Sequence, residues 1–141
     1  MSFEFQQRVR TQHCDPGGSV FYPRYFEMLT VCAEEWFAAV LGLSYSDMRD
    51  VRKIGTPTVS VGADFQAPSR VGDMLEWRVV PQRLGRTSCD LCYRVTCNGE
   101  ARVELLQTIV LIDMESRRSL PWPDDLREKI EREFVTREGM A

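Results

Sequence analysis

The sequence predicts an α+β fold in which an antiparallel sheet of about five strands wraps around one long buried helix. Apolar residues recur at steps of three and four over a long segment near the N-terminus, and this spacing is typical of a helix. Four later segments alternate apolar and polar residues, and this period is typical of strands. The four segments follow one another through short turns, so we expect them to pair antiparallel.

The long helix is expected from about Pro23 to Leu41, after a first strand over residues 3–11. Pro23 suits a first helical turn, where its missing N–H has no helical partner to lose, and Gly42 suits the position after the last turn. The apolar stripe is broad and the charged face is narrow, so this helix should be mostly buried. The stripe comprises Tyr22, Phe26, Leu29, Ala33, Trp36, Phe37, Val40 and Leu41.

Four further strands are expected over residues 58–67, 74–80, 89–97 and 101–111. Asn98-Gly99, between the last two, is the strongest hairpin signal in the chain. We expect a β-bulge near Leu106, because the apolar alternation is interrupted there. The inward rows are predicted to be Val59, Val61, Ala63, Phe65 and Ala67; Leu75, Trp77 and Val79; Cys89, Leu91, Tyr93, Val95 and Cys97; and Ala101, Val103, Leu105, Ile109 and Leu111.

A short amphipathic helix is expected at the C-terminus, where Leu126, Ile130 and Phe134 have helical spacing after the break at residues 121–123. One sheet face must cover the buried helix. A sheet wrapped around a central helix is the hotdog arrangement, and residues 1–141 suffice for one such domain but not for two cores. The other sheet face should be wet or used for assembly, because it carries Ser60, Asp64, Glu76, Arg78 and Arg94.

Composition argues against several classes of function. The formal net charge of -3 argues against nucleic acid as a bulk partner. No segment approaches the roughly 18 consecutive apolar residues of a membrane span, and residues 1–10 lack the apolar core of a signal peptide, so a cytoplasmic location is expected. Five cysteines favour free thiols. No metal site is expected, because His13 is the only histidine and Cys89 and Cys92 have no second ligand pair.

Asp15 is the first candidate for chemistry, because it lies in a glycine-rich loop that leads into the long helix. Free N–H groups at a helix start can stabilise an oxyanion, and a nearby carboxylate can attack a carbonyl or activate water. Gly17 and Gly18 would allow backbone and substrate to approach closely. From residue types alone the plainer alternative is favoured, in which Asp15 only caps the helix or begins a turn.

The segment from Asp15 to Phe26, Asp-Pro-Gly-Gly-Ser-Val-Phe-Tyr-Pro-Arg-Tyr-Phe, resembles the signature of the 4-hydroxybenzoyl-CoA thioesterase family. Two weaker stretches also resemble it, Gly55-Thr56-Pro57 with the following strand and the turn Gly85-Arg86-Thr87-Ser88. The matching stretches occur in the same order as in the family, and the likeness spans residues 5–113. It implies a hotdog fold, a homodimer or homotetramer, and hydrolysis of an acyl-CoA thioester without a metal or another cofactor.

The resemblance also implies roles for individual residues. Asp15 matches the catalytic carboxylate, and Tyr22 matches the helix-start residue whose backbone N–H faces the thioester oxygen. Arg86 and Ser88 fall on the turn that contacts the CoA nucleotide. This turn carries fewer basic residues than the matching turn in the family. Arg83 could supply the missing positive charge for the phosphate contact. Thr56 or Ser60 is expected to face an acyl group bound by the neighbouring subunit, and Gly18 to lie against the substrate.

An aryl-CoA such as 4-hydroxybenzoyl-CoA or benzoyl-CoA is the expected substrate. A related branch of the family, linked to short-chain acyl groups, has His where this chain has Tyr22. The aromatic residues Phe21, Tyr25 and Phe26 fit an aryl group, although such a stripe is more often core packing. His13 is expected to point the same way as Asp15 if the strand alternation continues, which leaves a tuning role open.

Two other functions compete with hydrolysis. The chain could be a non-catalytic hotdog module that binds an acyl-CoA or an acyl-carrier protein, but such a module has no need of a carboxylate at the helix start. A dehydratase of the same fold is a third possibility, and the helix lacks the histidine and carboxylate pair expected of it. Asp15 is therefore the residue that discriminates between these functions.

Overall fold

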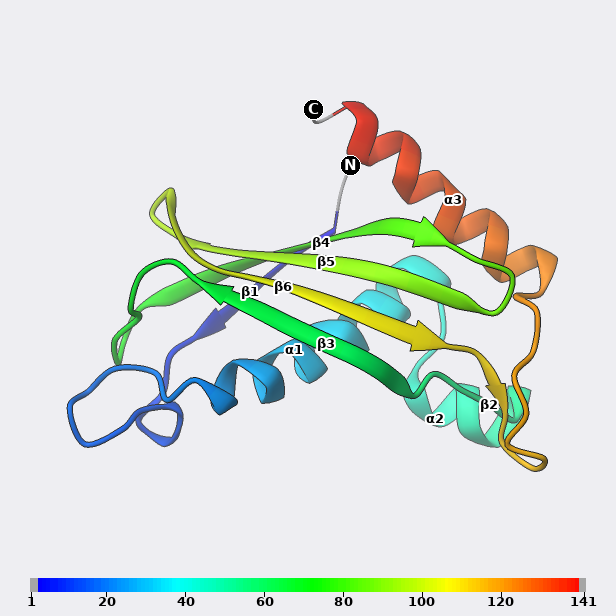
Figure 1. The fold of residues 1–141 in the computed structure, drawn as a ribbon, viewed down its shortest axis with the longest axis horizontal. Helices are drawn as coiled ribbons and strands as arrows, with labels where there is room; N and C mark the ends of the chain where they lie inside the picture. Colours follow the sequence, from blue (N-terminus) through cyan, green and yellow to red (C-terminus); the bar gives the residue numbers. More distant parts are fainter. Residues whose placement is uncertain (1–2, 140–141) are drawn as a thin grey trace.

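The computed structural model describes residues 3–139 of the chain, and the side chains of residues 3–134. A five-stranded antiparallel sheet, in the order β1-β4-β5-β6-β3, lies over the long helix α1 (Figure 1). The predicted α+β class, with a sheet wrapped around a central helix, is confirmed. The strands are β1 (Phe3–Arg8), β3 (Thr58–Phe65), β4 (Met74–Leu84), β5 (Ser88–Cys97) and β6 (Glu100–Val110).

The central helix has the predicted extent. Helix α1 (Pro23–Trp36) continues as a π-helical turn, η2 (Phe37–Leu41), and Gly42 follows it with a φ of 69°. A short helix α2 (Tyr45–Asp47) and a second π-helical turn η3 (Met48–Arg52) come next. The C-terminal helix α3 (Asp124–Gly139) lies against β4 and η2 (Figure 1). None of the helices within residues 3–139 combines the length and the apolar character needed to cross a membrane.

The core lies between α1 and the concave face of the sheet. Trp36 of α1 and Trp77 of β4 are fully buried, and Tyr93 of β5 packs edge-on against Trp77 with ring centroids 6.2 Å apart. Leu126 and Ile130 of α3 are buried in the same cluster. The inward rows predicted for β4 and β5 are therefore confirmed. The Asn98-Gly99 hairpin is also confirmed, because both residues have the positive φ that such a turn requires.

Two local predictions are wrong. The first strand ends at Arg8, and Thr11–His13 forms a 3-10 turn, η1, in place of the extended backbone expected there. β6 has no bulge near Leu106, because Gln107 occupies the inward position in regular register with Val61 and Leu91. A small sheet of β2 (Ile54–Gly55) and β7 (Ile112–Asp113) was not predicted, since two-residue strands carry no period.

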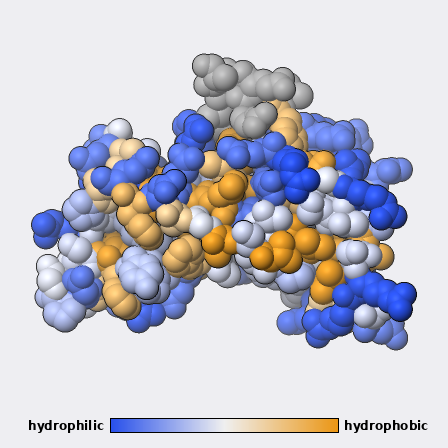
Figure 2. All heavy atoms as spheres, in the orientation of Figure 1, coloured by the Kyte–Doolittle hydropathy of each residue, from blue (hydrophilic) through white to orange (hydrophobic). Residues whose placement is uncertain are grey.

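β3 is an edge strand with an exposed apolar row. Val61 and Phe65 lie in register with the buried β6 residues Gln107 and Val103, so they occupy the inward face as predicted. They nevertheless remain 44% and 51% exposed. Figure 2 shows hydrophobic surface across the middle of the molecule, on the side that carries β3. An exposed apolar edge strand of this kind is a surface suited to pairing with another chain.

Two neighbouring leucines of β6 provide a test of this packing. Leu105 is fully buried and Leu106, on the outer face, is 46% exposed. We expect Leu105→Ala to lower the free energy of unfolding by about 2–5 kcal/mol, because it leaves a cavity in the core. Leu106→Ala, the matched control, should cost less than about 1 kcal/mol. Urea denaturation of both variants measures the difference, and equal losses would contradict the assigned register.

Candidate active site

Asp15 begins a tight turn in the loop between η1 and α1. Its Oδ1 accepts hydrogen bonds from the N–H groups of Gly17 at 2.9 Å and Ser19 at 3.4 Å, and its carbonyl accepts from the Gly18 N–H at 3.0 Å. Gly18 has a φ of 88°, a conformation that favours glycine. The carboxylate is exposed, and Oδ2 has no hydrogen-bond donor among the described residues. One oxygen is therefore held by backbone and the other is available.

The entry into α1 leaves one backbone donor available. Tyr22 is the N-cap, with no side-chain cap, and Pro23 has no N–H. Arg24 and Tyr25 donate to the carbonyls of Phe21 and Tyr22 at 2.9 and 3.2 Å. Within the described chain, no acceptor faces the Tyr22 N–H. The helix start thus offers a single free donor at Tyr22. Asp15 does not cap the helix, but it does begin a turn, which is the other form of the plainer alternative.

The segment between β3 and β4 holds the Asp15 loop in position. The Val20 N–H donates to the Ser69 carbonyl at 2.9 Å, and the Val71 N–H donates to the Gly18 carbonyl at 3.3 Å. The Ser69 Oγ in turn accepts the phenolic hydrogen of Tyr25 on α1, at 2.9 Å. The loop, the helix and this segment therefore form one hydrogen-bonded unit.

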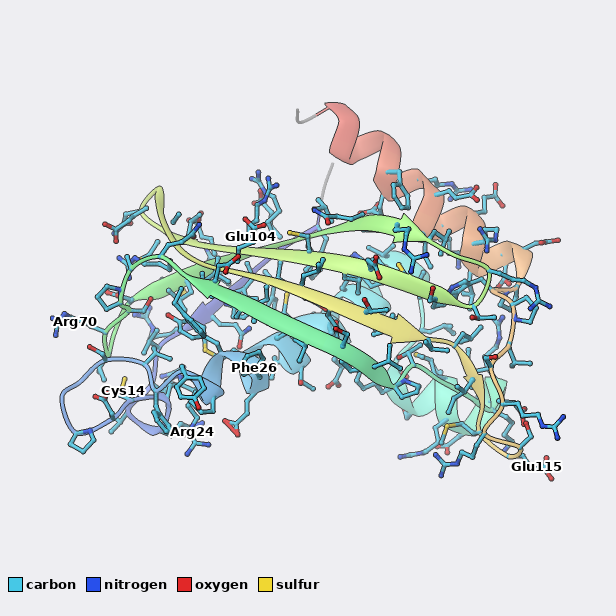
Figure 3. The ribbon with its side chains drawn as sticks, viewed as in Figure 1. Cys14, Arg24, Phe26, Arg70, Glu104 and Glu115 are labelled. Carbon is cyan, nitrogen blue, oxygen red and sulfur yellow. The ribbon has the colours of Figure 1, made fainter. Side chains whose placement is uncertain are left out.

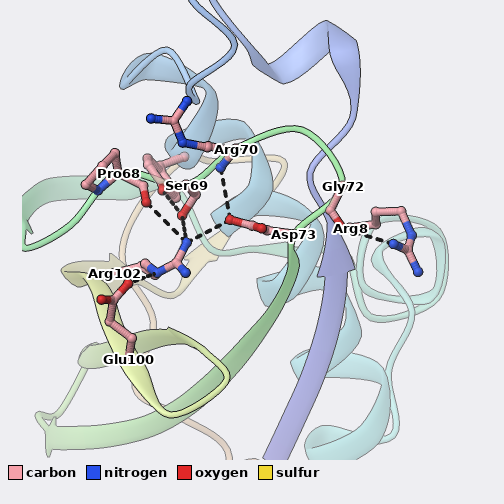
Figure 4. A network of polar contacts seen from close by, with 9 residues as sticks. Arg8, Pro68, Ser69, Arg70, Gly72, Asp73, Glu100 and Arg102 are labelled. Atoms are coloured by element: carbon pink, nitrogen blue, oxygen red, sulfur yellow. Dashed lines mark hydrogen bonds and ion pairs between the residues drawn. The ribbon is translucent and has the colours of Figure 1, made fainter.

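Arg102 of β6 anchors that unit (Figure 4). One guanidinium nitrogen donates to the Pro68 carbonyl at 3.2 Å, to the Ser69 Oγ at 3.1 Å and to the Asp73 carboxylate at 2.8 Å. The Arg102 Nε lies 2.7 Å from a carboxylate oxygen of Glu100. Two hydrogen bonds hold the pKa of Asp73 below its usual value: first one from the Arg70 backbone N–H, then one from Arg102. Asp73 is therefore an anion at neutral pH.

Two cavities lie along the helix on the β3 side of the molecule. The smaller, of about 370 Å³, is next to the helix start and is lined by Val20, Tyr22, Tyr25, Phe65, Gln66, Ala67, Pro68 and Ser69. The larger, of about 430 Å³, lies further along the helix and is mainly apolar. Its lining includes Thr30, Phe37, Tyr45, Thr56, Thr58 and Gln107. Tyr22 lines the smaller cavity, whereas Thr56 lines the larger one.

The remaining predicted site residues are spread over the molecule. Ser60 is on the outer face, in register with Thr108, and it does not line either cavity. Gly85, Arg86 and Ser88 form the β4–β5 turn, at the opposite end of an eleven-residue strand from the Asp15 loop. At about 3.4 Å per residue, this strand separates the two sites by roughly 35 Å. Figure 3 shows these two ends of the molecule, with Cys14 and Arg70 at one end and Glu115 at the other.

Two arginines, Arg83 and Arg86, lie at the β4–β5 turn. The Arg83 guanidinium is paired with Asp90 at 3.0 Å and reaches the Ser88 hydroxyl at 3.3 Å. Trp122 fixes the turn from outside, because its N–H donates to the Arg86 carbonyl at 3.0 Å and its indole to the Ser88 carbonyl, also at 3.0 Å. The exposed Arg86 side chain has no ion pair among the described residues. Arg86 is thus available to an anion, whereas Arg83 is engaged.

His13 is occupied elsewhere. Its Nδ1 accepts the Arg10 backbone N–H at 2.8 Å within η1, and its ring lies in a hollow with Arg24 and Glu27 of the helix. Partial burial lowers the pKa of His13, which disfavours its charged form at neutral pH. The expected strand alternation through His13 is wrong, because the first strand ends at Arg8 and His13 lies in η1.

Sequence reasoning missed three residues of this region, Thr58, Gln107 and Arg102. Gln107 lies where the apolar alternation of β6 is interrupted, and it faces inward. Arg102 lies on a strand whose other charged residues are exposed, and its burial depends on the segment that folds over it. A polar residue at an inward position of an alternating strand was the one signal available for Gln107.

Comparison with known proteins agrees with this geometry. Residues 9–130 match the family described as the Thioesterase-like superfamily. The chain is 27% identical to a 1,4-dihydroxy-2-naphthoyl-CoA hydrolase of Nostoc punctiforme, over 99% of this chain and 93% of the relative. It is 28% identical to a 4-hydroxybenzoyl-CoA thioesterase of a Pseudomonas species, over 90% and 96%. The solved structure of a gentisyl-coenzyme A thioesterase superposes with a TM-score of 0.80 at 26% identity, covering 89% of this chain and 99% of that one.

The fold is a hotdog sheet over a central helix, and the chain belongs to the thioesterase-like superfamily. The resemblance to 4-hydroxybenzoyl-CoA thioesterases, read from the Asp15–Phe26 segment, is confirmed at the level of this family. The enzyme class is that of the acyl-CoA thioesterases.

The anchoring anion Asp73 gives the site a pH-dependent stability. The pKa of Asp73 is depressed in the folded chain, so its stabilising contribution is present above the unfolded value of about 3.9 and is lost as pH falls below it. We expect Asp73→Asn to lower the free energy of unfolding by about 1–3 kcal/mol at pH 7, and by less at pH 3. Urea denaturation across this range tests the effect, with the exposed Asp64→Asn as control. A loss equally large at pH 3 would contradict the assignment.

Proposed function

We propose that the protein hydrolyses an aryl-CoA thioester to the free acid and CoA, with Asp15 as nucleophile or general base. One observation carries the proposal. An exposed carboxylate, held by backbone through one oxygen, lies in the turn that leads to a helix start with a free N–H at Tyr22. A thioester carbonyl seated on that N–H would have its developing negative charge stabilised beside the carboxylate. Gly18, without a side chain, would let the substrate approach this turn closely.

Two routes are open to Asp15. As a nucleophile, its free oxygen attacks the thioester carbon, the C–S bond breaks, the CoA thiolate leaves, and water then cleaves the resulting mixed anhydride. As a general base, Asp15 takes a proton from water while the hydroxyl oxygen attacks the same carbon, and the proton passes to the departing sulfur. Both routes place negative charge on the former carbonyl oxygen, which the Tyr22 N–H would stabilise.

An aromatic acyl group is supported by two considerations. The three relatives above carry names in which the acyl group is aromatic: dihydroxynaphthoyl, hydroxybenzoyl and gentisyl. The larger cavity of about 430 Å³ is lined by Phe37, Tyr45, Met48 and Ile54, which suit a flat apolar ring. Thr56 adds a polar group to its rim.

The CoA nucleotide would bind at the β4–β5 turn. Arg86 is exposed and unpaired among the described residues, so it can meet a phosphate without giving up an internal partner. Arg83 is already paired with Asp90, and Ser88 receives a hydrogen bond from it, so both would contribute less unless that pair opens. Arg86 is therefore the first candidate for the phosphate contact.

Asp15 and the β4–β5 turn lie far apart within one chain. In a homodimer, Asp15 of one subunit would lie near the β4–β5 turn of the other. The free edge of β3 carries exposed apolar residues, and its central Gly62 would meet no atom within 4 Å if it bore a Cβ. A two-fold axis through Gly62 would pair β3 with its own copy, because an antiparallel pair of identical strands is self-complementary. The Phe65 end of one subunit would then adjoin the Thr58 end of the other.

That arrangement would place two different cavities, one from each subunit, side by side. The smaller cavity, with Tyr22 and Phe65, would adjoin the partner's larger cavity, with Thr56 and Thr58. Asp15 of one subunit would thus work on an acyl group held by the other. A tetramer could follow through the outer sheet face, which carries the ion pairs Arg78–Glu4 and Arg94–Glu104.

Asp15→Asn tests the catalytic proposal, because it removes the charge and keeps the shape. We expect kcat on the best aryl-CoA substrate to fall by about 10³-fold, with KM little changed, since a group that acts only in the transition state is lost. Thiol release is the measurement. Glu115→Gln, an exposed carboxylate at the far end of the molecule, should keep full activity. Wild-type turnover in Asp15→Asn would rule out Asp15 as nucleophile or general base, whereas no turnover in the wild type itself would favour the non-catalytic acyl-CoA-binding module.

A single turnover in heavy-oxygen water separates the two routes. A nucleophilic Asp15 carries label into the protein when water attacks the Asp15 carbon of the mixed anhydride, whereas attack on the acyl carbon sends the label to the acid. A general base leaves the protein unlabelled and sends all the label to the acid. Label in the peptide that contains Asp15, measured by mass spectrometry, therefore establishes the nucleophilic route.

Val61→Lys tests the dimer. We expect the wild-type mass in solution to be at least twice the 16.3 kDa of one chain. Val61→Lys should shift the assembly toward monomer and lower activity with it, because the charge faces its own copy near the two-fold axis. Val51→Lys, at an exposed valine outside β3, should leave the assembly intact. Light scattering at micromolar concentration measures both, and a monomeric wild type would contradict the proposal.

A further inference from the structure

A chain of hydrogen bonds runs from the core to the larger cavity. Gln107 is only 6% exposed and lies in the inward row of β6, between the apolar Leu105 and Ile109. Its Oε1 lies 2.6 Å from the Tyr93 hydroxyl, and its Nε2 lies 2.8 Å from the Thr58 Oγ1. Gln107 and Thr58 both line the larger cavity. The amide therefore connects a fully buried phenol to a hydroxyl group that is open to the cavity.

The direction of this chain is determined by Tyr93. A phenol carries one hydrogen, and burial raises the pKa of Tyr93 well above its usual value, so that hydrogen stays in place. If the Gln107 amide were reversed, the Tyr93 hydrogen would have no acceptor among the described residues, and a buried unpaired donor is costly. Tyr93 therefore donates to Oε1, and Nε2 donates to Thr58.

Thr58 is the last residue in this chain of hydrogen bonds. Its oxygen accepts a hydrogen bond from Gln107, and its own hydroxyl hydrogen makes no bond to the described residues. The Thr58 side chain is exposed, and its hydroxyl hydrogen has no acceptor among the described residues. Thr30, in the same cavity, differs in this respect. Its hydroxyl donates to the Phe26 carbonyl at 3.1 Å, so its hydrogen is already engaged within α1. Both threonines present a hydroxyl group to the cavity. Among the described contacts, the Thr58 hydrogen is free to bond a ligand, and the Thr30 hydrogen is not.

We infer that the Thr58 hydroxyl, oriented by Gln107 and Tyr93, donates a hydrogen bond to an oxygen atom on the acyl group. Thr58 is then a specificity-determining residue, and Gln107 and Tyr93 are positioning residues that act through it. The inference rests on the proposed aryl-CoA hydrolysis and narrows it. Aryl groups that bear an oxygen substituent are favoured over the unsubstituted ring, because a site built around a donor discriminates against a ligand that leaves the donor unpaired.

Thr58→Val removes the hydroxyl and keeps the shape of the side chain. We compare kcat/KM for two substrates, benzoyl-CoA and the best of the ring-hydroxylated benzoyl-CoA thioesters. The quantity measured is the kcat/KM of the hydroxylated substrate divided by that of benzoyl-CoA. We expect the wild-type ratio to exceed one, and Thr58→Val to lower it about ten-fold, which corresponds to one lost hydrogen bond. Thr58→Ser should restore it, because the hydroxyl returns. Thr30→Val, the matched control, should leave the ratio unchanged.

Tyr93→Phe tests the positioning role. Without the phenolic hydrogen, the amide can reverse and take the Thr58 hydrogen for itself, so the ratio should fall as it does in Thr58→Val. A purely structural role would lower the activity on both substrates together and leave the ratio unchanged. A ratio that is unchanged in Thr58→Val would overturn the inference even if Tyr93→Phe failed to fold.

Failure of the proposed function is distinguishable from failure of this inference. If the wild type hydrolyses no aryl-CoA, the proposed function fails, and calorimetry with the free acids then tests Thr58 without catalysis. Tighter binding of ring-hydroxylated benzoates than of benzoate, lost in Thr58→Val and kept in Thr30→Val, would support the inference. Equal affinities in the wild type and in Thr58→Val would overturn it.

Discussion

Burial of the central helix under the concave face of the sheet is the constraint from which the rest of the structure follows. Met28, Leu29, Cys32 and Trp36 of α1 are buried in one cluster with Trp77, Tyr93 and Leu105 of the sheet. Such interiors are packed closely enough that the helix has little freedom to slide or turn. The position of its first residue is thereby set, and with it the loop that carries Asp15. The position of the Asp15 loop is therefore a consequence of core packing some distance away.

The same constraint leaves the molecule asymmetric. The inward-facing apolar residues of β4 and β5 are covered, but Val61 and Phe65 on β3 are not. The uncovered strand is also the one that borders both cavities, because Phe65 lines the smaller and Thr58 the larger. A sheet that covered β3 completely within one chain would have no open cavity beside the helix start. The incompletely buried edge strand therefore contributes residues to both cavities.

Two networks of polar groups within the described fold have different tasks. Arg102, Asp73 and Ser69 hold the Asp15 loop against the helix through bonds to backbone and to Tyr25. Tyr93, Gln107 and Thr58 run from the core to the larger cavity. In each network a buried group is satisfied by a neighbour that is itself more exposed, so neither leaves a buried charge unpaired. The first positions the backbone around the carboxylate, and the second presents a hydroxyl to the cavity.

The sequence by itself determined the features that depend on near neighbours along the chain. The extent of the central helix, the Asn98-Gly99 hairpin, the inward rows of β4 and β5 and the Asp15 turn all follow from local periodicity and turn chemistry. The tertiary structure decided the rest. Whether Gln107 faces inward, whether Arg102 is buried and whether β3 is covered depend on the register of distant strands and on the segment that folds over them. Those contacts join residues about 30–50 positions apart, as in Gln107 with Thr58 and Arg102 with Ser69, and no local pattern in the sequence encodes such distances.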